Sequence, residues 1–284
     1  MLQTVLVPLT GFDSDVSALE TAYLIAKIFD SDIHCIYFSS AWIEIAAELA
    51  ATDATMPSGE IYAALDQGRR QAGERARRHF AEFCQRRNVT HGRSASGPRS
   101  VSAHMREIRG DVGGEVVAEG QFYDLIVLSR TPEGHGFGST IINVGRPVVL
   151  APNQVPERFG STVAIAWKRS AEAARALTAA MPILVKAKEV IVVAADEGAG
   201  PEATMGSAER AAAYLRQHDL VVETECVAID QRSAASAIVQ AALAKKADLL
   251  VMGAYGHSRL RELVLGGMTR EVLTDCPIPV FLFH

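Results

Sequence analysis

The C-terminal half of the chain alternates apolar runs with segments of helical periodicity. The apolar runs cover residues 162–167, 188–195, 220–229, 248–253 and 278–283, and helical periodicity marks residues 170–185, 202–217, 232–246 and 267–275. Runs that are apolar at consecutive positions are typical of parallel strands covered by helices on both faces. Five strands alternating with four helices predict an open, doubly wound α/β sheet. Ser170 and Ser233 are expected to cap two of the helices, and Pro277 closes the last one.

The N-terminal half repeats this plan. The segment TVLVPLTGFDSDVSALETA at residues 4–22 resembles TVAIAWKRSAEAARALTAA at residues 162–180, and DLIVLS at 124–129 recurs as DLLVMG at 248–253. Both DLIVLS and DLLVMG are followed by glycines and then by an apolar segment typical of a strand. The repeat predicts two α/β domains in one chain, each a doubly wound, five-stranded parallel sheet.

The expected domain boundaries follow from a change in composition. The segment APNQVPERFG at residues 151–160 contains two prolines and a glycine, as is typical of a linker. We therefore predict a first domain at residues 1–152, a linker at 153–160 and a second domain at 161–284. Within the first domain, residues 41–58 form an insertion of undetermined structure, and residues 59–88 are expected to form an extended helix.

Composition and charge indicate a soluble globular protein. Hydrophobic residues make up 49% of the chain and charged residues 21%, with a formal net charge of −5. The acidic balance gives no reason to expect nucleic acid or an anionic membrane as a partner. The four cysteines are widely separated and show no metal-site spacing. No secretory signal or membrane-spanning run is evident, so a cytoplasmic location is the default expectation.

A glycine-containing segment follows the fourth apolar run of the C-terminal half. The sequence GAYGHSRLRELVLGGMT at residues 253–269 lies where ligands bind in open α/β sheets, beyond the carboxyl ends of the strands. Peptide N–H groups at the start of the final helix would lack intrahelical partners and favour an anion. The glycine spacing alone is equally consistent with a plain turn into a helix. A P-loop motif is absent.

The spacing of these glycines resembles the signature of a known family. Gly253-x2-Gly256-x9-Gly266, followed by Gly267-Met268-Thr269, is similar to the G-2x-G-9x-G-[S/T] motif of universal stress proteins. The resemblance covers the C-terminal half and, more weakly, the N-terminal half. It implies a tandem universal stress protein with adenine nucleotide alpha-hydrolase-like domains, flavodoxin-like layering and a pseudo-twofold relation between the halves.

The resemblance implies an adenine-nucleotide site in the C-terminal domain, for ATP or AMP, with magnesium accompanying ATP. The candidate binding residues are Ala166, Lys168, Ala194, Gly253, Gly256, His257, Gly266, Gly267, Met268 and Thr269. Main chain near Ala194 would meet the adenine, Gly253 and Gly256 would line the ribose and phosphate region, and the residues from Gly266 to Thr269 would hold phosphate oxygens. His257 would add positive charge.

Three departures from the family pattern affect this expectation. Lys168 replaces the acid that follows the first strand in the family, and it would reach a phosphate or another acid, or remain solvated. Gly267 stands where the family has Ser or Thr, which leaves Thr269 as the nearest hydroxyl. In the N-terminal domain Thr10 replaces the acid and the glycine loop is eight residues shorter, so this domain's site is expected to be degenerate.

Three classes of function are consistent with these residues. The first is a stress-response regulatory protein that binds ATP or AMP and acts with an unknown protein partner. The second is a nucleotide-independent interaction protein whose domains pair through the apolar segments 147–151 and 279–283, within the chain or in a homodimer. The third is an enzyme, at most a slow nucleotide hydrolase or an adenylyl-transfer relative. No nucleophile or acid–base pair is identified for this class. A magnesium-binding acid facing Gly266 would distinguish it from the other two classes.

Overall fold

The computed structural model describes residues 2–38, 58–91, 101–108, 112–130, 137–229, 233–254 and 267–284. Its N-terminal half contains the strands β1 (Thr4–Leu9), β2 (Asp32–Phe38), β3 (Thr90–His91), β4 (Ser102–Ile108), β5 (Leu125–Leu128) and β6 (Val148–Leu150). The helices of this half are α1 (Ser14–Phe29), α3 (Ser58–Arg87), α4 (Val112–Gly120) and α5 (Phe137–Asn143). The long helix predicted at 59–88 is confirmed as α3. The predicted insertion at 41–58 lies outside the described residues, except for Ser58.

The C-terminal half contains the elements that the hydrophobic pattern predicts. Its strands are β7 (Thr162–Ala166), β8 (Glu189–Asp196), β9 (Val222–Ala228), β10 (Leu249–Gly253) and β11 (Val280–Phe283), and its helices are α6 (Ala171–Leu184), α7 (Pro201–Arg216), α8 (Ala234–Ala244) and α9 (Gly267–Thr274). Both predicted caps are confirmed. The Ser170 hydroxyl accepts from the N–H of Ala173 at 3.2 Å, and the Ser233 hydroxyl accepts from the N–H of Ser236 at 3.0 Å.

All the described strands belong to one sheet. Their spatial order is β3-β4-β2-β1-β5-β6-β11-β10-β7-β8-β9, so the five main strands of each half lie in the order 3-2-1-4-5. Every neighbouring pair within a half is parallel. This confirms the two doubly wound domains, and the two-residue β3 adds an edge strand that the pattern did not predict.

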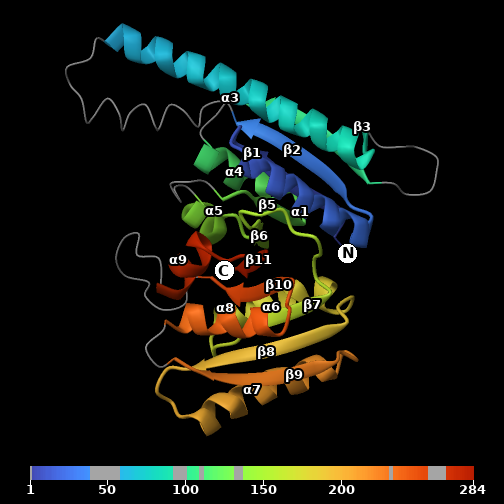
Figure 1. Ribbon diagram of the computed structural model, residues 1–284, viewed down its shortest axis with the longest axis vertical. Coiled ribbons are helices and arrows are strands. Elements are labelled where there is room, and N and C mark those ends of the chain that lie inside the picture. Colours follow the sequence, from blue (N-terminus) through green and yellow to red (C-terminus); the bar gives the residue numbers. More distant parts are fainter. Residues whose placement is uncertain are drawn as a thin grey trace.

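The two halves are joined by the one antiparallel pair among the described strands. β6 of the N-terminal half pairs with β11 of the C-terminal half, with Val149 opposite Phe281. The sheet therefore runs along the long axis of the molecule, and β6 and β11 lie near its middle (Figure 1). The prediction that the last strand of each half pairs domain to domain is confirmed within the chain.

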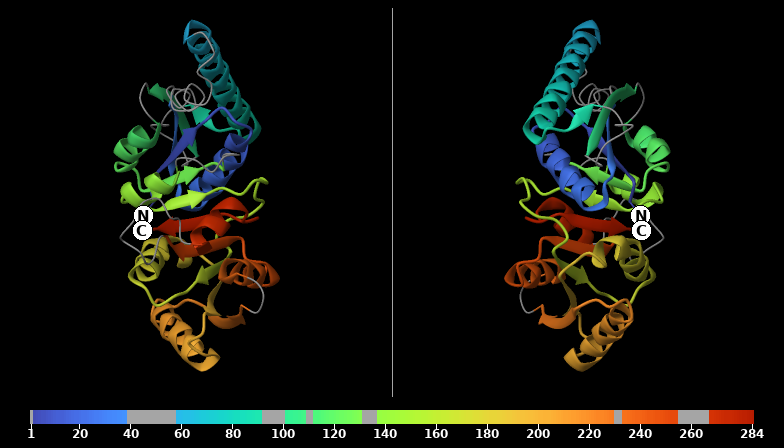
Figure 2. Two further views of the ribbon diagram at one scale, coloured as in Figure 1. Left: turned by 90° about the vertical axis from the view of Figure 1, so that its left-hand side faces the viewer. Right: turned by 90° about the vertical axis from the view of Figure 1, so that its right-hand side faces the viewer.

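Helices cover both faces of this sheet in two layers (Figure 2). One apolar cluster contains buried residues of α1, α3, α6 and α7, including Leu19, Phe83 and Leu177. The other contains buried residues of α4, α5, α8 and α9, including Ile238 and Val272. Each cluster draws residues from both halves, so the packed core continues across the β6–β11 junction. Among the described residues, no helix combines the length and apolar character needed to cross a membrane.

The repeated aspartate of DLIVLS and DLLVMG has a structural role. The Asp248 carboxylate accepts from the N–H groups of Ser161 at 2.9 Å and Thr162 at 3.2 Å, at the start of β7. Asp124 accepts in the same way from Gln3 and Thr4, at the start of β1. These hydrogen bonds satisfy peptide groups at the amino ends of the strands. The aspartates therefore lie at the edge of the sheet opposite the glycine motif.

Candidate functional site

A cavity of about 630 Å³ lies at the carboxyl ends of β7, β8 and β10. Its lining in the described part of the chain consists of Ala166, Trp167, Lys168, Arg169, Ser170, Glu172, Ala173, Ala194, Ala195, Glu197, Ala199, Ala203, Thr204, Ser207, Ala234, Ile238, Met252, Gly253 and Thr269. β7 lies between β8 and β10, so the cavity occupies the point where the winding direction of the sheet reverses. Its volume falls within the range of small-molecule sites, about 300–1,000 Å³.

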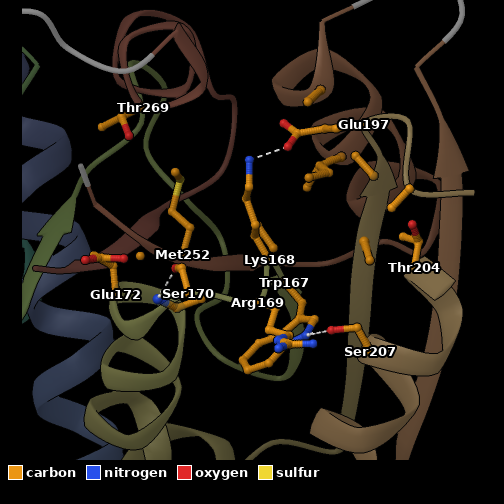
Figure 3. A pocket seen from close by; sticks show the side chains of 18 of the residues that line it. Trp167, Lys168, Arg169, Ser170, Glu172, Glu197, Thr204, Ser207, Met252 and Thr269 are labelled. Atoms are coloured by element: carbon orange, nitrogen blue, oxygen red, sulfur yellow. Dashed lines mark hydrogen bonds and ion pairs between the residues drawn. The ribbon is translucent and has the colours of Figure 1, made fainter. Parts of the chain in front are cut away.

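The residues that follow β7 extend toward the wall of the cavity formed by β8 and α7. The indole N–H of Trp167 donates to the hydroxyl of Ser207 at 3.0 Å, which fixes the ring against α7. The ammonium group of Lys168 forms an ion pair with the carboxylate of Glu197, which follows β8 (Figure 3). The Lys168 side chain is 63% exposed, so this pair is solvated and contributes little to stability.

Asp196 shapes the turn between β8 and α7. Its carboxylate accepts from the N–H groups of Gly198 at 3.1 Å and Gly200 at 3.0 Å, and from the hydroxyl of Thr204 at 3.3 Å. Gly198 and Gly200 have φ values of +103° and +90°, which favour glycine. Asp196, the last residue of β8, therefore holds the turn that leads into α7.

The first turn of α6 forms another wall, and Gly253 packs against it. A Cβ atom at Gly253 would lie 2.6 Å from the nitrogen of Ala173 and 2.6 Å from the carbonyl carbon of Glu172. The missing side chain therefore allows β10 and α6 to approach each other. The sequence interpretation attributed this glycine to a ligand or to positive φ, whereas the packing of α6 already requires it.

Glu172 belongs to this first turn of α6 and packs against Gly253. A hydrogen bond from its own peptide N–H, together with one from Ser170, lowers the pKa of its carboxyl group. A carboxylate in the first turn of a helix is also favoured by the macrodipole. The two acids in the described lining therefore both have partners, since Glu197 is paired with Lys168.

Helix α9 begins at Gly267, as the glycine motif predicts, and Thr269 in its first turn is 5% exposed and lines the cavity. The first N–H groups of any α-helix lack intrahelical acceptors, so Gly267, Met268 and Thr269 supply such groups here. On its other side α9 is held to the start of α8, because the hydroxyl of Ser233 donates to the carboxylate of Glu271 at 2.6 Å.

The cavity brings together five of the ten predicted binding residues: Ala166, Lys168, Ala194, Gly253 and Thr269. Gly267 and Met268 begin α9, and Gly256, His257 and Gly266 lie outside the described residues. The sequence interpretation did not identify the lining contributed by α7 and α8, such as Ala203, Ser207 and Ala234. The small residues four positions apart on α7 could have indicated that this helix face lines a cavity, but the same spacing is typical of a helix face packed against a sheet.

At the corresponding strand ends of the N-terminal half, the described side chains of α1, of β2 and of the turn after β1 are engaged with one another or with α3. Asp15, fully buried in α1, accepts from the peptide N–H and hydroxyl of Thr10 and from the N–H of Gly11, at 3.0, 2.8 and 2.7 Å. Tyr37 occupies the place in β2 that Ala194 occupies in β8, counted from the residues paired with β1 and β7. Its ring is buried and its hydroxyl donates to the carbonyl of Arg69 in α3.

The fold and the cavity define the class of protein: two doubly wound α/β domains in tandem, the second of which contains a cavity of the size of a small-molecule site. Residues 162–284 match the profile of the universal stress protein family. The C-terminal half is thus a universal stress protein domain.

Relatives of known sequence agree with this match. The chain is 29% identical to Universal stress protein Slr1230 of Synechocystis sp. over 175 residues, which cover 57% of this chain and 58% of that protein. It is 46% identical to a universal stress protein of Thermus aquaticus over 48 residues, which cover 17% of this chain and 35% of that protein. The chain therefore spans less than two thirds of either relative.

Two solved structures show that the fold extends to the N-terminal half. A universal stress protein from Archaeoglobus fulgidus DSM 4304 superposes with a TM-score of 0.67 and 16% identity, covering 99% of this chain and 97% of that chain. A functionally unknown protein from Pseudomonas aeruginosa PAO1 gives a TM-score of 0.58 and 16% identity, covering 99% and 92%. At this identity the likeness concerns the fold alone.

Proposed function

We propose that the chain is a tandem universal stress protein that binds an adenine nucleotide, ATP or AMP, in the cavity of its C-terminal half and acts as a stress-response regulator. The observation that carries the proposal is the cavity at the reversal point of the sheet, lined there by Thr269 in the first turn of α9, whose first peptide N–H groups are main-chain donors. The N-terminal half, where Tyr37 stands at the place of Ala194 and is hydrogen-bonded to α3, binds no nucleotide in this proposal.

The lining supports a planar base at one end and phosphate oxygens at the other. Ala194 and Ala195 at the end of β8 are small, so the cavity has room for a planar base beside the strand. Thr269 and the first N–H groups of α9 supply donors for phosphate. The described lining has two cations, Lys168 and Arg169, and two carboxylates, Glu172 and Glu197. The preference for an anion therefore rests on the peptide groups of α9.

The described residues do not form a protein-borne magnesium site. Within the described residues, no group of three or more His, Cys, Asp or Glu side chains is placed to hold a metal ion. The two carboxylates of the lining are engaged with Lys168 and with the peptide group of Glu172 itself. Any magnesium that accompanies ATP would take its ligands from the phosphates and water.

A substitution that fills the cavity tests this function. Ala203 and Ala213 are both exposed alanines of α7, but only Ala203 lines the cavity. We expect wild type and Ala213→Trp to bind ATP or AMP in calorimetric titration, whereas Ala203→Trp loses at least about tenfold in affinity because the indole occupies the ligand volume. Equal binding by both variants would place the nucleotide elsewhere.

The second candidate function is a nucleotide-independent interaction protein. The ion pair between Lys168 and Glu197 favours it, because a cation stands where the family has an acid and already has a partner. If wild type binds neither ATP nor AMP, this second function replaces the first.

A further inference from the structure

Arg130, which follows β5 in the N-terminal half, reaches across the junction between the halves. Its guanidinium is buried, with 7% of the residue exposed. It donates to the carbonyls of Val272 at 3.1 Å, Leu273 and Cys276 at 3.3 Å, and to that of Ala151 at 3.2 Å. Three of these four acceptors belong to the C-terminal end of α9 and the turn that follows it. One side chain thus caps a helix of the other domain.

The chemistry of both partners suits this contact. The last carbonyls of a helix have no intrahelical donors and carry the negative end of the macrodipole. A guanidinium offers five N–H groups in a planar fork, and a buried one needs acceptors for them. Within the described residues no carboxylate forms an ion pair with Arg130, and burial lowers the pKa of this group. Carbonyls at the end of α9 and in the turn after it therefore supply most of the compensation for burying the charge.

Helix α9 depends on such contacts because it is short. Its eight residues span about 12 Å, and helices of this length do not persist in water on their own. The end that Arg130 caps therefore lies within about 12 Å of Gly267 and nearer still to Thr269, which lines the cavity. A helix this short moves as one unit, so holding one end restricts the other.

The residue equivalent to Arg130 in the C-terminal half cannot make the reciprocal contact. Aligning DLIVLS with DLLVMG places Ala254 at the position equivalent to Arg130, and its methyl side chain offers no donor to α5 of the N-terminal half. The N-terminal half thus holds the last helix of the half that contains the cavity.

We propose that Arg130 is a positioning residue through which the N-terminal half sets the affinity of the C-terminal cavity for its ligand. The identity of the ligand rests on the proposed nucleotide function, whereas the positioning of α9 by Arg130 does not. Arg130 holds α9 so that the peptide groups at Gly267 are already in place before a phosphate arrives, which lowers the ordering cost of binding.

The structural step is tested on the unliganded full-length protein by amide hydrogen exchange. In Arg130→Met we expect the amides of residues 267–276 to exchange at least about tenfold faster, while those of α6 change little. Arg130→Lys should restore part of the protection, since it keeps the charge but not the fork. Arg146→Met is the control, because Arg146 also donates to a carbonyl, that of Gln121 at 2.9 Å, but within its own half.

The link to the site is tested by titrating ATP and AMP into the same variants. Arg130→Met should lose at least about tenfold in affinity and Arg146→Met should match wild type. Unchanged exchange in α9, or a uniform increase throughout the protein, would overturn the positioning role. Faster exchange in α9 with unchanged affinity would overturn the link to the cavity. If wild type binds neither nucleotide, the proposed function fails, and the exchange data alone decide whether Arg130 positions α9.

Discussion

At the scale of single residues, the glycine motif contains glycines of different kinds. Gly253 is required by the close approach of α6, whereas Gly267 begins α9 at the cavity. The sequence alone does not distinguish such glycines, because a glycine that packing requires and a glycine beside a ligand look the same in the motif. Only the neighbouring backbone distinguishes them, and at Gly253 that backbone belongs to the residues that follow β7.

Gly253→Ala should therefore destabilise the fold. The added methyl group would press on the backbone of Glu172 and Ala173, which cannot rotate away, so α6 must shift. We expect a loss of about 1–3 kcal/mol in the free energy of unfolding, measured by urea denaturation. Gly206→Ala in α7 is the control, since nothing lies within 4 Å of its Cβ position, and it should be neutral or slightly stabilising. Equal stability of the two variants would show that α6 does not restrict Gly253.

Glu172 gives a prediction for pH. Its folded-state pKa is lowered by its own peptide N–H and by Ser170, so its stabilising contribution is present above the unfolded pKa and is lost as pH falls through the folded pKa. Glu172→Gln should cost roughly 0.5 kcal/mol at neutral pH, a value kept small by solvent screening. The difference from wild type should disappear at a pH below the usual range of a glutamate. A difference that persists in acid would mean that the charge is not its cause.

At the scale of the elements, the sequence predicts most of the fold for a physical reason. The inner strands of the C-terminal half are buried on both faces, so β8 and β10 appear as continuous apolar runs. Local caps such as Ser170 and Ser233 define the helix starts. The two-residue β3 was not predicted, because a strand of this length is too short to show a hydrophobic pattern.

The site was less predictable than the elements, because its walls come from separate segments. The strand ends at Ala166, Ala194 and Gly253 follow from the topology, and they were predicted. The walls formed by α7 and α8 depend on how those helices rotate over the sheet, which no local pattern records. The same limit applies to Tyr37. It appears as an ordinary strand residue, and only the structure shows that it is buried and hydrogen-bonded to α3 at the place that Ala194 takes in β8.

At the scale of the whole molecule, the continuous sheet predicts that the two halves unfold together. β11 lies between β10 and β6, so Phe281, 1% exposed, packs in a strand shared by both halves. Phe281→Ala should lower the free energy of unfolding by about 3–5 kcal/mol, whereas Phe122→Ala, at a phenylalanine that is 81% exposed, should change it little.

Amide exchange shows whether this loss reaches the distant half. If the sheet and its two apolar clusters behave as one cooperative unit, Phe281→Ala should accelerate exchange by similar factors in β2 and in β8, although Phe281 belongs to the C-terminal half. Faster exchange in β8 with β2 unaffected would mean that the β6–β11 junction does not couple the halves. In that case the only route left for the N-terminal half to influence the cavity would be a local one, such as the contact of Arg130 with α9.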